Sequence, residues 1–467
     1  MQCARLQVPL DWTDLNDSRT VELAVIRVPA TVPITDPRYG GAVIINPGGP
    51  GGSGVLLALK AGQSIQTIIS AGSDTASAES SKHFDIISFD PRGVNNTTPS
   101  FTCFPDYIKA TTYELENTAT GLFDSSDASY DVLWAKIRAM ASGCSKRSVD
   151  SGIGEFMTTA SVSRDIIEIV ERHGQWREKE ARKALFPASL TGRWSKQSPL
   201  KTPEHVSIRD RVKYRPGEEL VQYWGFSYGS LLGATLAAMF PERVSRVALD
   251  GVVDGFDYMK GEWLTNLQDT DMEIASFGEL CWLGGPEHCA LYHEDGPAVI
   301  VESFMSVVAD LKKNPIGVPA TADHAADVAT YGDLKEFFWS TATYKPLTKF
   351  HRAAEVLLEL SQGNGTGLLQ ARFDKIKDLG SGLSAQCKKD GPYSRSCYRE
   401  TGEWNENAAI AIMCTDSTGH NNLTKEEYWE YAQGLMGQSR LLGDVWAKLR
   451  LPCTQVSVIL STCKTDH

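Results

Sequence analysis

Residues 220–254 constrain the fold of this chain more than any other stretch. An apolar run, Leu220–Trp224, leads into Gly225-Phe226-Ser227-Tyr228-Gly229. A run of small residues typical of a helix follows and stops at Pro241, and a second apolar run covers Val244–Leu249. The G-x-S-x-G pattern between a strand and a helix needs small residues beside the serine, because glycine tolerates the backbone of so tight a turn. The sequence therefore predicts a serine held at the tip of a sharp strand-to-helix turn.

Such a turn is typical of a nucleophile elbow. The serine would lie above the edge of a sheet, at the N-terminus of a helix whose dipole stabilises a developing anion. We therefore predict that Ser227 is a catalytic nucleophile. By the same geometry, the backbone N–H of Tyr228 is the first donor of an oxyanion hole.

A second glycine-rich loop follows an early buried strand. Val43–Ile45 runs into Asn46-Pro47-Gly48-Gly49-Pro50-Gly51-Gly52-Ser53-Gly54. Glycines let bare backbone approach a substrate closely, so we predict that the N–H of Gly49 completes the oxyanion hole. A phosphate-binding turn is the alternative, but the loop has neither G-K-[ST] nor the G-x-G-x-x-G register. The sequence predicts no cofactor site and, lacking any C-x-x-C pair, no metal site.

The order of the predicted elements indicates an α/β-hydrolase fold, with a mostly parallel sheet and a large inserted helical cap. We expect the core at residues 1–254, with a basic insertion at 172–217, the cap at 255–447, and a remnant of the core at 448–467. The insertion holds twelve Lys and Arg against four Asp and Glu. It is either a solvated surface insertion or a docking site for an acidic partner. Other expected elements are an antiparallel pair at 5–8 and 21–28, a helix at 55–69, a strand at 85–89, an amphipathic helix at 163–173, and cap helices at 263–281, 297–312, 334–340, 347–360, 368–379, 403–413 and 425–436.

Composition narrows the class of protein. The 467 residues are 42% hydrophobic and 22% charged, and the formal net charge is −12. This acidity argues against nucleic-acid binding as the main role, and no apolar run approaches the eighteen or so residues of a membrane span. The expected partner is a peptide or small-molecule substrate; oligomeric state is not predicted.

The ten cysteines favour disulfides in an oxidising compartment. Connectivity does not follow from sequence alone. Our hypothesis pairs Cys103–Cys144, Cys281–Cys289, Cys387–Cys397 and Cys414–Cys453, leaving Cys3 and Cys463. Sequons at Asn16, Asn95, Asn96, Asn364 and Asn422 also favour a secretory route. Residues 1–10 lack the apolar region of a signal peptide, so we expect either a cytosolic protein with free thiols or a chain whose N-terminus lies further upstream.

Five motifs in order carry a family resemblance: CARLQVPLDW, INPGGPGGSG, DIISFDPRGV, YWGFSYGS with VALDGVVD, and AIMCTD at 411–416. Over roughly residues 3–453 the chain resembles the tripeptidyl-aminopeptidase and prolyl-aminopeptidase branch of the α/β-hydrolases, the S33 peptidase family. The resemblance implies cleavage of short N-terminal peptides, or of similar amides and esters. It also implies that Gly49 is the oxyanion donor and that the Arg92 stretch is structural. A typical member has His where this chain has Pro47 or Asn46.

The catalytic base and acid are the main departure from the family pattern. In this fold the acid and then the histidine each follow a late core strand. After the cap only residues 449–467 remain, with one candidate strand at 456–460 and Asp466 roughly where the acid would fall. His467 is its direct neighbour and cannot be the base. We expect the other histidines to be structural or surface residues: His83, His173, His205, His288, His293, His324, His351 and His420.

Three functions therefore stay open. The chain is an aminopeptidase-like serine hydrolase, a catalytically impaired relative that binds peptides or small molecules, or a hydrolase of non-peptide esters or amides. A truncated gene product would explain the missing strands, and we expect it from the unfinished core.

Overall fold

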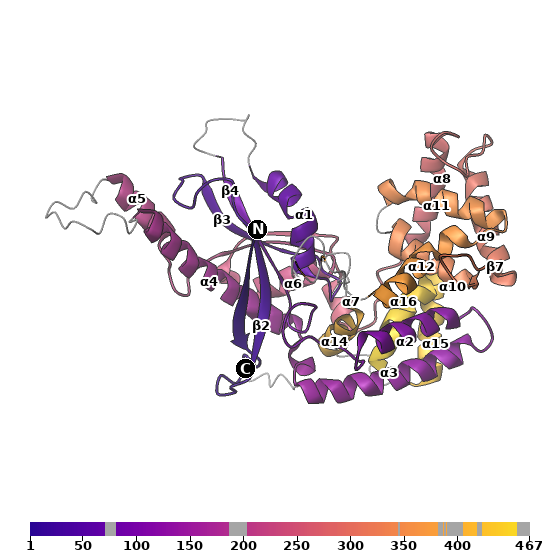
Figure 1. The fold of residues 1–467 in the computed structure, drawn as a ribbon, viewed down its shortest axis with the longest axis horizontal. Coiled ribbons are helices and arrows are strands. Elements are labelled where there is room, and N and C mark those ends of the chain that lie inside the picture. The colour runs from indigo at the N-terminus through magenta and orange to yellow at the C-terminus, as the bar shows by residue number, and fades with distance from the viewer. Residues whose placement is uncertain are drawn as a thin grey trace.

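The computed structural model describes residues 1–70, 81–185, 203–343, 346–381, 405–417 and 423–454, together with Gln386 and Lys389. Figure 1 shows a sheet-containing body on one side and a helical cap on the other, joined through α7 (Gly255–Lys260) and α14 (Glu406–Asp416). The predicted Cys387–Cys397 pair, Cys463, Asp466 and His467 lie outside the described residues.

A six-stranded sheet forms the core, in the order β1-β2-β4-β3-β5-β6. The pairs β4–β3, β3–β5 and β5–β6 are parallel. The pairs β1–β2 and β2–β4 are antiparallel. The predicted opening antiparallel pair and mostly parallel sheet are therefore confirmed. The strands are β1 (Gln2–Pro9), β2 (Thr20–Val28), β3 (Tyr39–Asn46), β4 (His83–Asp90), β5 (Val221–Phe226) and β6 (Val244–Asp250).

Burial along the strands follows their place in the sheet. In β4, every residue from Phe84 to Asp90 is buried, as expected for a central strand covered on both faces. β6 is exposed or partly buried along its whole length, and in the described part of the chain no strand pairs with its outer edge. Together with the helices beside it, this sheet fits the α/β-hydrolase fold that the sequence predicts.

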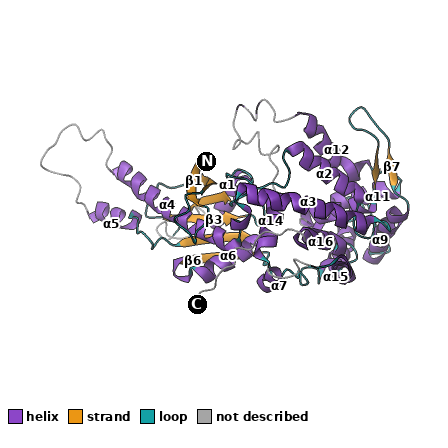
Figure 2. Ribbon diagram, turned by 90° about the horizontal axis from the view of Figure 1, so that it is seen from below, coloured by secondary structure: helices purple, strands orange, loops and turns teal. Residues whose placement is uncertain are grey.

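Helices α1, α4 and α6 pack against the sheet. The amphipathic helix predicted at 163–173 is longer than expected and continues to Leu185, so that with α5 it forms an arm that projects beyond the sheet (Figures 1 and 2). Residues 186–202 of the predicted basic insertion lie outside the described residues. The helices of this half are α1 (Gly54–Ile69), η1 (Gly154–Phe156), α4 (Thr159–Leu185), α5 (Pro203–Val212), α6 (Tyr228–Met239) and η3 (Pro241–Arg243).

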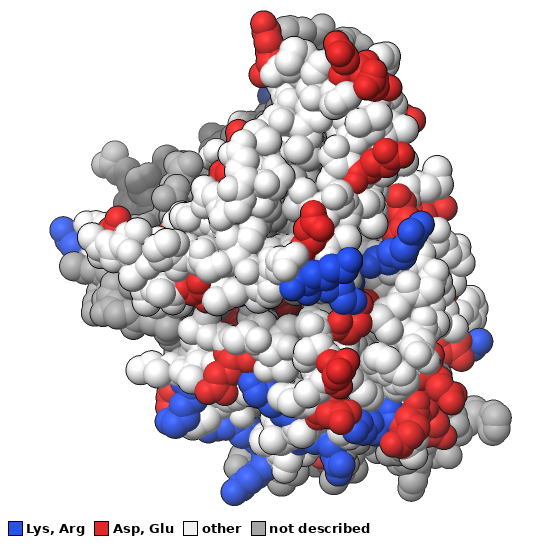
Figure 3. Space-filling view, turned by 90° about the vertical axis from the view of Figure 1, so that its right-hand side faces the viewer, with Lys and Arg blue, Asp and Glu red and all other residues white. Residues whose placement is uncertain are grey.

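The cap is mainly helical, as predicted, but contains one small hairpin that the sequence did not indicate, β7 (Ile316–Val318) with β8 (Asp327–Ala329). Seen from its outer end, the molecule presents mainly Asp and Glu in the upper part of the view, and Lys and Arg beside Asp and Glu in the middle and lower parts (Figure 3). The remaining elements are α2 (Tyr107–Thr120), α3 (Ser129–Ser151), α7 (Gly255–Lys260), α8 (Thr270–Gly284), α9 (Pro297–Lys313), α10 (Tyr331–Phe337), η4 (Phe338–Thr343), α11 (Pro346–Ser361), α12 (Thr366–Ser381), α14 (Glu406–Asp416), α15 (Lys425–Gln438), α16 (Gly443–Arg450) and η5 (Leu451–Thr454).

Two large apolar clusters stabilise the molecule, and they do not follow chain order. The cluster on the sheet includes 408–414 from α14, whereas residues 122–137, which precede the elbow in sequence, pack with the cap helices. α14 therefore lies against the core although it follows most of the cap.

Three of the predicted disulfides are present: Cys103–Cys144, Cys281–Cys289 and Cys414–Cys453. Cys3 is an exposed free thiol. Within the described ranges, no helix is long and apolar enough to cross a membrane.

Candidate active site

Ser227 occupies the turn between β5 and α6 in a backbone conformation that side chains rarely adopt, with φ of +54° and ψ of −125°. Two backbone hydrogen bonds hold it there: its N–H donates to the carbonyl oxygen of Asp250 at 2.8 Å, and its own carbonyl oxygen accepts from Ser230 N–H at 2.7 Å. Among the described residues, Ser227 Oγ makes no capping hydrogen bond to α6. The strained turn therefore presents a serine hydroxyl that the helix terminus does not use.

Close backbone contacts explain the small residues of the turn. A Cβ on Gly225 would lie 2.2 Å from the carbonyl oxygen of Gly229, and one on Gly229 would lie 3.0 Å from Asn46. A larger residue at Gly225 would open the turn, so the G-x-S-x-G pattern is a steric requirement of this backbone.

The glycine-rich loop contacts the elbow directly. A Cβ on Gly48, which has φ of +83°, would lie 2.1 Å from the carbonyl oxygen of Phe226 and 2.9 Å from the nitrogen of Tyr228. Gly49, with φ of +114°, is next in sequence. The fold thus brings together the two segments that the sequence predicts for the oxyanion hole.

Asn46 holds the start of this loop. Its buried side-chain oxygen accepts from Gly48 N–H at 2.9 Å, and its backbone lies close to Gly229. Asn46 therefore fixes the loop beside the elbow. At Asn46 or Pro47, a typical member of the family is expected to have histidine.

Tyr228 is connected to an acid from the other end of the chain. Its phenol shares a short hydrogen bond of 2.5 Å with the hydroxyl of Thr159, the first residue of α4. That hydroxyl donates to Asp416 Oδ2 at 2.6 Å, and the Thr159 N–H donates to Oδ1 at 2.8 Å. Tyr258 from α7 also donates to Oδ2, at 3.3 Å. Burial raises the pKa of the Asp416 carboxyl to about 6, although the three donors oppose this shift.

The sequence alone predicts no role for Asp416. The signal was present in AIMCTD, one of the motifs that carried the family resemblance. Its partner Thr159 is 257 positions away, so no local pattern could have joined them.

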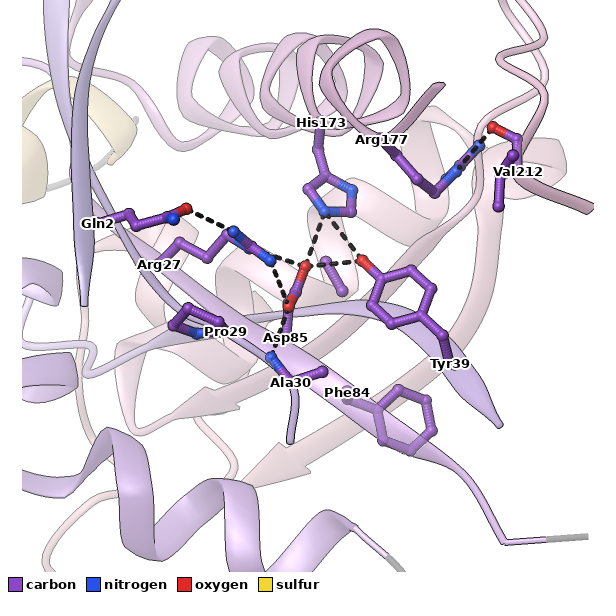
Figure 4. Close-up of polar contacts among 12 residues, drawn as sticks. Gln2, Arg27, Pro29, Ala30, Tyr39, Phe84, Asp85, His173, Arg177 and Val212 are labelled. Carbon is purple, nitrogen blue, oxygen red and sulfur yellow. Dashed lines mark hydrogen bonds and ion pairs between the residues drawn. The ribbon is translucent and has the colours of Figure 1, made fainter. Parts of the chain in front are cut away.

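His173 lies away from Ser227, at the end of the sheet where β3 and β4 begin. Figure 4 shows it pointing from α4 toward Asp85, where Tyr39 and Arg27 also converge. Its Nε2 lies 3.1 Å from Asp85 Oδ2. Although burial opposes it, hydrogen bonding by His173, Arg27 and Tyr39 leaves the pKa of the Asp85 carboxyl well below its usual range. This buried cluster joins the starts of the two strands to α4 and is structural.

The other histidines whose side chains are described have no recorded bond to Ser227 either; His420 and the side chain of His205 lie outside the described part of the chain. His83 bonds Thr31, and His324 stacks on Phe373 within the cap. In the described part of the chain, no recorded hydrogen bond or ion pair joins a histidine to Ser227, and no group of three or more His, Cys, Asp or Glu is placed to hold a metal ion.

No family model matches the chain. Among curated proteins, it is 25% identical over 395 residues to tripeptidyl aminopeptidase of Streptomyces lividans, across 83% of this chain and 58% of that protein. It is 27% identical over 252 residues to serine protease Hip1 of Mycobacterium tuberculosis, across 54% of this chain and 36% of the relative. It is also 35% identical over 165 residues to carboxylesterase B of Mycobacterium tuberculosis, across 35% of this chain and 28% of the relative.

The alignment with the tripeptidyl aminopeptidase thus spans a little over half of that relative's length. These similarities agree with the family resemblance that the motifs indicate. The observed sheet, and the strand, turn and helix around Ser227, agree with the α/β-hydrolase fold predicted from the sequence. The chain is thus similar to tripeptidyl aminopeptidases and other serine hydrolases, which is consistent with an S33-like α/β-hydrolase.

Proposed function

We propose that this chain is a serine hydrolase that cleaves peptide bonds, or related amide and ester bonds, through an acyl-enzyme on Ser227. The observation that carries the proposal is the strained Ser227 turn in contact with the glycine loop. Relatives named tripeptidyl aminopeptidase and serine protease support the peptide substrate.

In the proposed reaction, Ser227 Oγ gives up its proton to a general base, which later protonates the leaving group, and bonds to the substrate's carbonyl carbon. The oxygen of that carbonyl becomes an anion and accepts hydrogen bonds from the N–H groups of Tyr228 and Gly49. Collapse of this intermediate breaks the bond to the leaving amine or alcohol, which takes up a proton. Water then releases the acyl group and regenerates the serine.

A second candidate function is the binding of peptides or small molecules without turnover. The observation that favours it is the lack of any histidine bonded to Ser227 in the described part of the chain. Loss of a triad member typically lowers kcat by several powers of ten, so residual turnover would be slow.

The named relative carboxylesterase B keeps a third candidate open, an esterase. A substrate panel tests all three: tripeptidyl amides with free and acetylated N-termini, aminoacyl amides, and short-chain nitrophenyl esters, each against the Ser227→Ala variant as control. Serine-dependent turnover of the free-amine tripeptidyl amide supports the proposal, and faster serine-dependent turnover of the esters favours the esterase. If no substrate is turned over above the Ser227→Ala background, binding of the unreacted peptides measured by calorimetry identifies the binding protein.

We further propose that the protein follows a secretory route. The three disulfides support this, as do the exposed sequon residues Asn16 and Asn364. Asn96 is a poor acceptor for a glycan, because its side-chain amide donates to Asp90 at 2.8 Å. Protein from its native source should lose mass on endoglycosidase treatment, with glycans at Asn16 or Asn364; an unglycosylated protein with ten free thiols would contradict this route.

A further inference from the structure

We propose that Asp416 is a positioning residue for the oxyanion hole, and that it acts through the hydroxyl of Thr159 on Tyr228. This inference rests on the proposed function of Ser227 and assigns to Asp416 a role that is exerted through other residues.

The direction of the hydrogen bonds defines the connection. The Thr159 hydroxyl has one proton, and it donates that proton to Asp416 Oδ2 at 2.6 Å. Its oxygen must therefore accept from the phenol of Tyr228. When Asp416 is ionised, both hydrogen bonds therefore run in the same direction: Tyr228 donates to Thr159, and Thr159 donates to the carboxylate.

Packing also restrains the side chain of Tyr228, in addition to these hydrogen bonds. Its side chain is 5% exposed, and its ring packs against Tyr258, with the centroids 5.8 Å apart. Because its backbone N–H is the proposed oxyanion donor, fixing the ring also fixes the first turn of α6. A displacement of about 1 Å in such a donor can lower a rate by about 10²-fold.

The other end of α14 holds the second half of the proposed hole. The Asn405 N–H, at the cap of α14, donates to the carbonyl oxygen of Gly51 at 2.9 Å. A Cβ on Gly51 would lie 2.6 Å from the Asn405 carbonyl oxygen and 3.1 Å from Ala409. One helix therefore contacts the glycine loop at its start and is bonded through Thr159 to the elbow at its end.

α14 is suited to this role because it is rigidly held. All residues from Ala408 to Thr415 are buried, and the Cys414–Cys453 disulfide ties its last turn to η5. The helix thus sets the separation of the two segments that supply Tyr228 and Gly49.

The test compares Asp416→Asn with Thr159→Val and with a matched control, Asp257→Asn. Asp257 is also a buried aspartate, and it accepts from both the N–H and the hydroxyl of one threonine, Thr265, at 2.9 and 2.8 Å. It has no recorded bond to Tyr228 or to the glycine loop. We expect Asp416→Asn and Thr159→Val to lower kcat by roughly 10- to 100-fold with KM changed less than about threefold, and the double variant to add little further. Asp257→Asn should retain the rate of the wild type.

Hydrogen exchange gives a readout that does not need turnover. In Asp416→Asn, amides of the elbow and of the glycine loop should exchange faster, whereas those of β1, β2 and the outer cap helices should not change. Unchanged elbow and loop amides, or faster exchange throughout the molecule as in a general loss of stability, would overturn the inference. If the wild type itself lacks turnover, the proposed function fails, and the exchange pattern still decides the role of Asp416.

Discussion

Replacing Gly48 by alanine tests whether the glycine loop is fitted against the elbow. The new Cβ would lie 2.1 Å from the carbonyl oxygen of Phe226, and the residue would keep φ of +83°. A non-glycine residue in this region costs about 1–2 kcal/mol, and overpacking against backbone adds about 1–3 kcal/mol. We therefore expect Gly48→Ala to lower the free energy of unfolding by roughly 2–5 kcal/mol.

Gly217→Ala separates the two contributions. Gly217 has φ of +77°, and no described atom lies within 4 Å of the position its Cβ would take. Gly217→Ala should therefore lower the free energy of unfolding only by the conformational cost of a non-glycine residue at positive φ, about 1–2 kcal/mol. For 467 residues the entropy of unfolding is about 1 kcal/mol per kelvin, so the melting temperature should fall by roughly 2–5 °C for Gly48→Ala and 1–2 °C for the control.

The assay is thermal unfolding together with the rate of labelling by a fluorophosphonate. Gly48→Ala should label at least about tenfold more slowly than the wild type, because the loop must move away from Tyr228. Gly217→Ala should label at the rate of the wild type. If the two variants match in both stability and labelling, the loop is not packed as described, and the reasoning is refuted.

Three further changes test other parts of the molecule. Arg92→Met leaves the carboxylate of Asp165, bonded to the buried guanidinium at 2.8 and 2.6 Å, without a counter-ion; we expect a loss of about 3–5 kcal/mol in urea unfolding, and substantial recovery on adding Asp165→Leu. Asp416 has a folded-state pKa of about 6, above its usual 3.8, so the folded state binds its proton more tightly than the unfolded state. Lowering the pH from 7 to 5 should therefore stabilise the wild type relative to Asp416→Asn by about 1 kcal/mol in urea unfolding, and a pH-independent difference would count against this. Cys414→Ser opens a loop of 39 positions to Cys453 and should cost about 4 kcal/mol in the chain-entropy model; an unchanged urea midpoint would show that the bridge adds nothing to stability.

The elbow region could be predicted because its geometry is encoded locally. The glycines at 225 and 229, the serine between them and the apolar runs on either side describe a strand, a turn and a helix without reference to distant residues. The same holds for β3 and β4, which are short, apolar and bounded by turn residues. Three disulfides also match the hypothesised pairing, although connectivity does not follow from sequence alone.

Contacts between distant segments could not be predicted in this way. Nothing near Thr159 indicates that its hydroxyl meets Asp416, and nothing near Asn405 indicates a bond to Gly51, because the chain passes through the cap in between. The β7–β8 hairpin has only three residues in each strand, too few for an alternating pattern to stand out. The division into residues 1–254, 255–447 and 448–467 stays a prediction.

Mass spectrometry of the phosphonylated protein tests most directly whether Ser227 is a nucleophile. We predict one adduct per chain, located by peptide mapping at Ser227 and lost in Ser227→Ala. Its formation should slow after replacement of Gly48 or Asp416. An intact wild-type protein that stays unlabelled at probe concentrations and times sufficient for slow serine hydrolases, or an adduct that persists in Ser227→Ala, would contradict the claim.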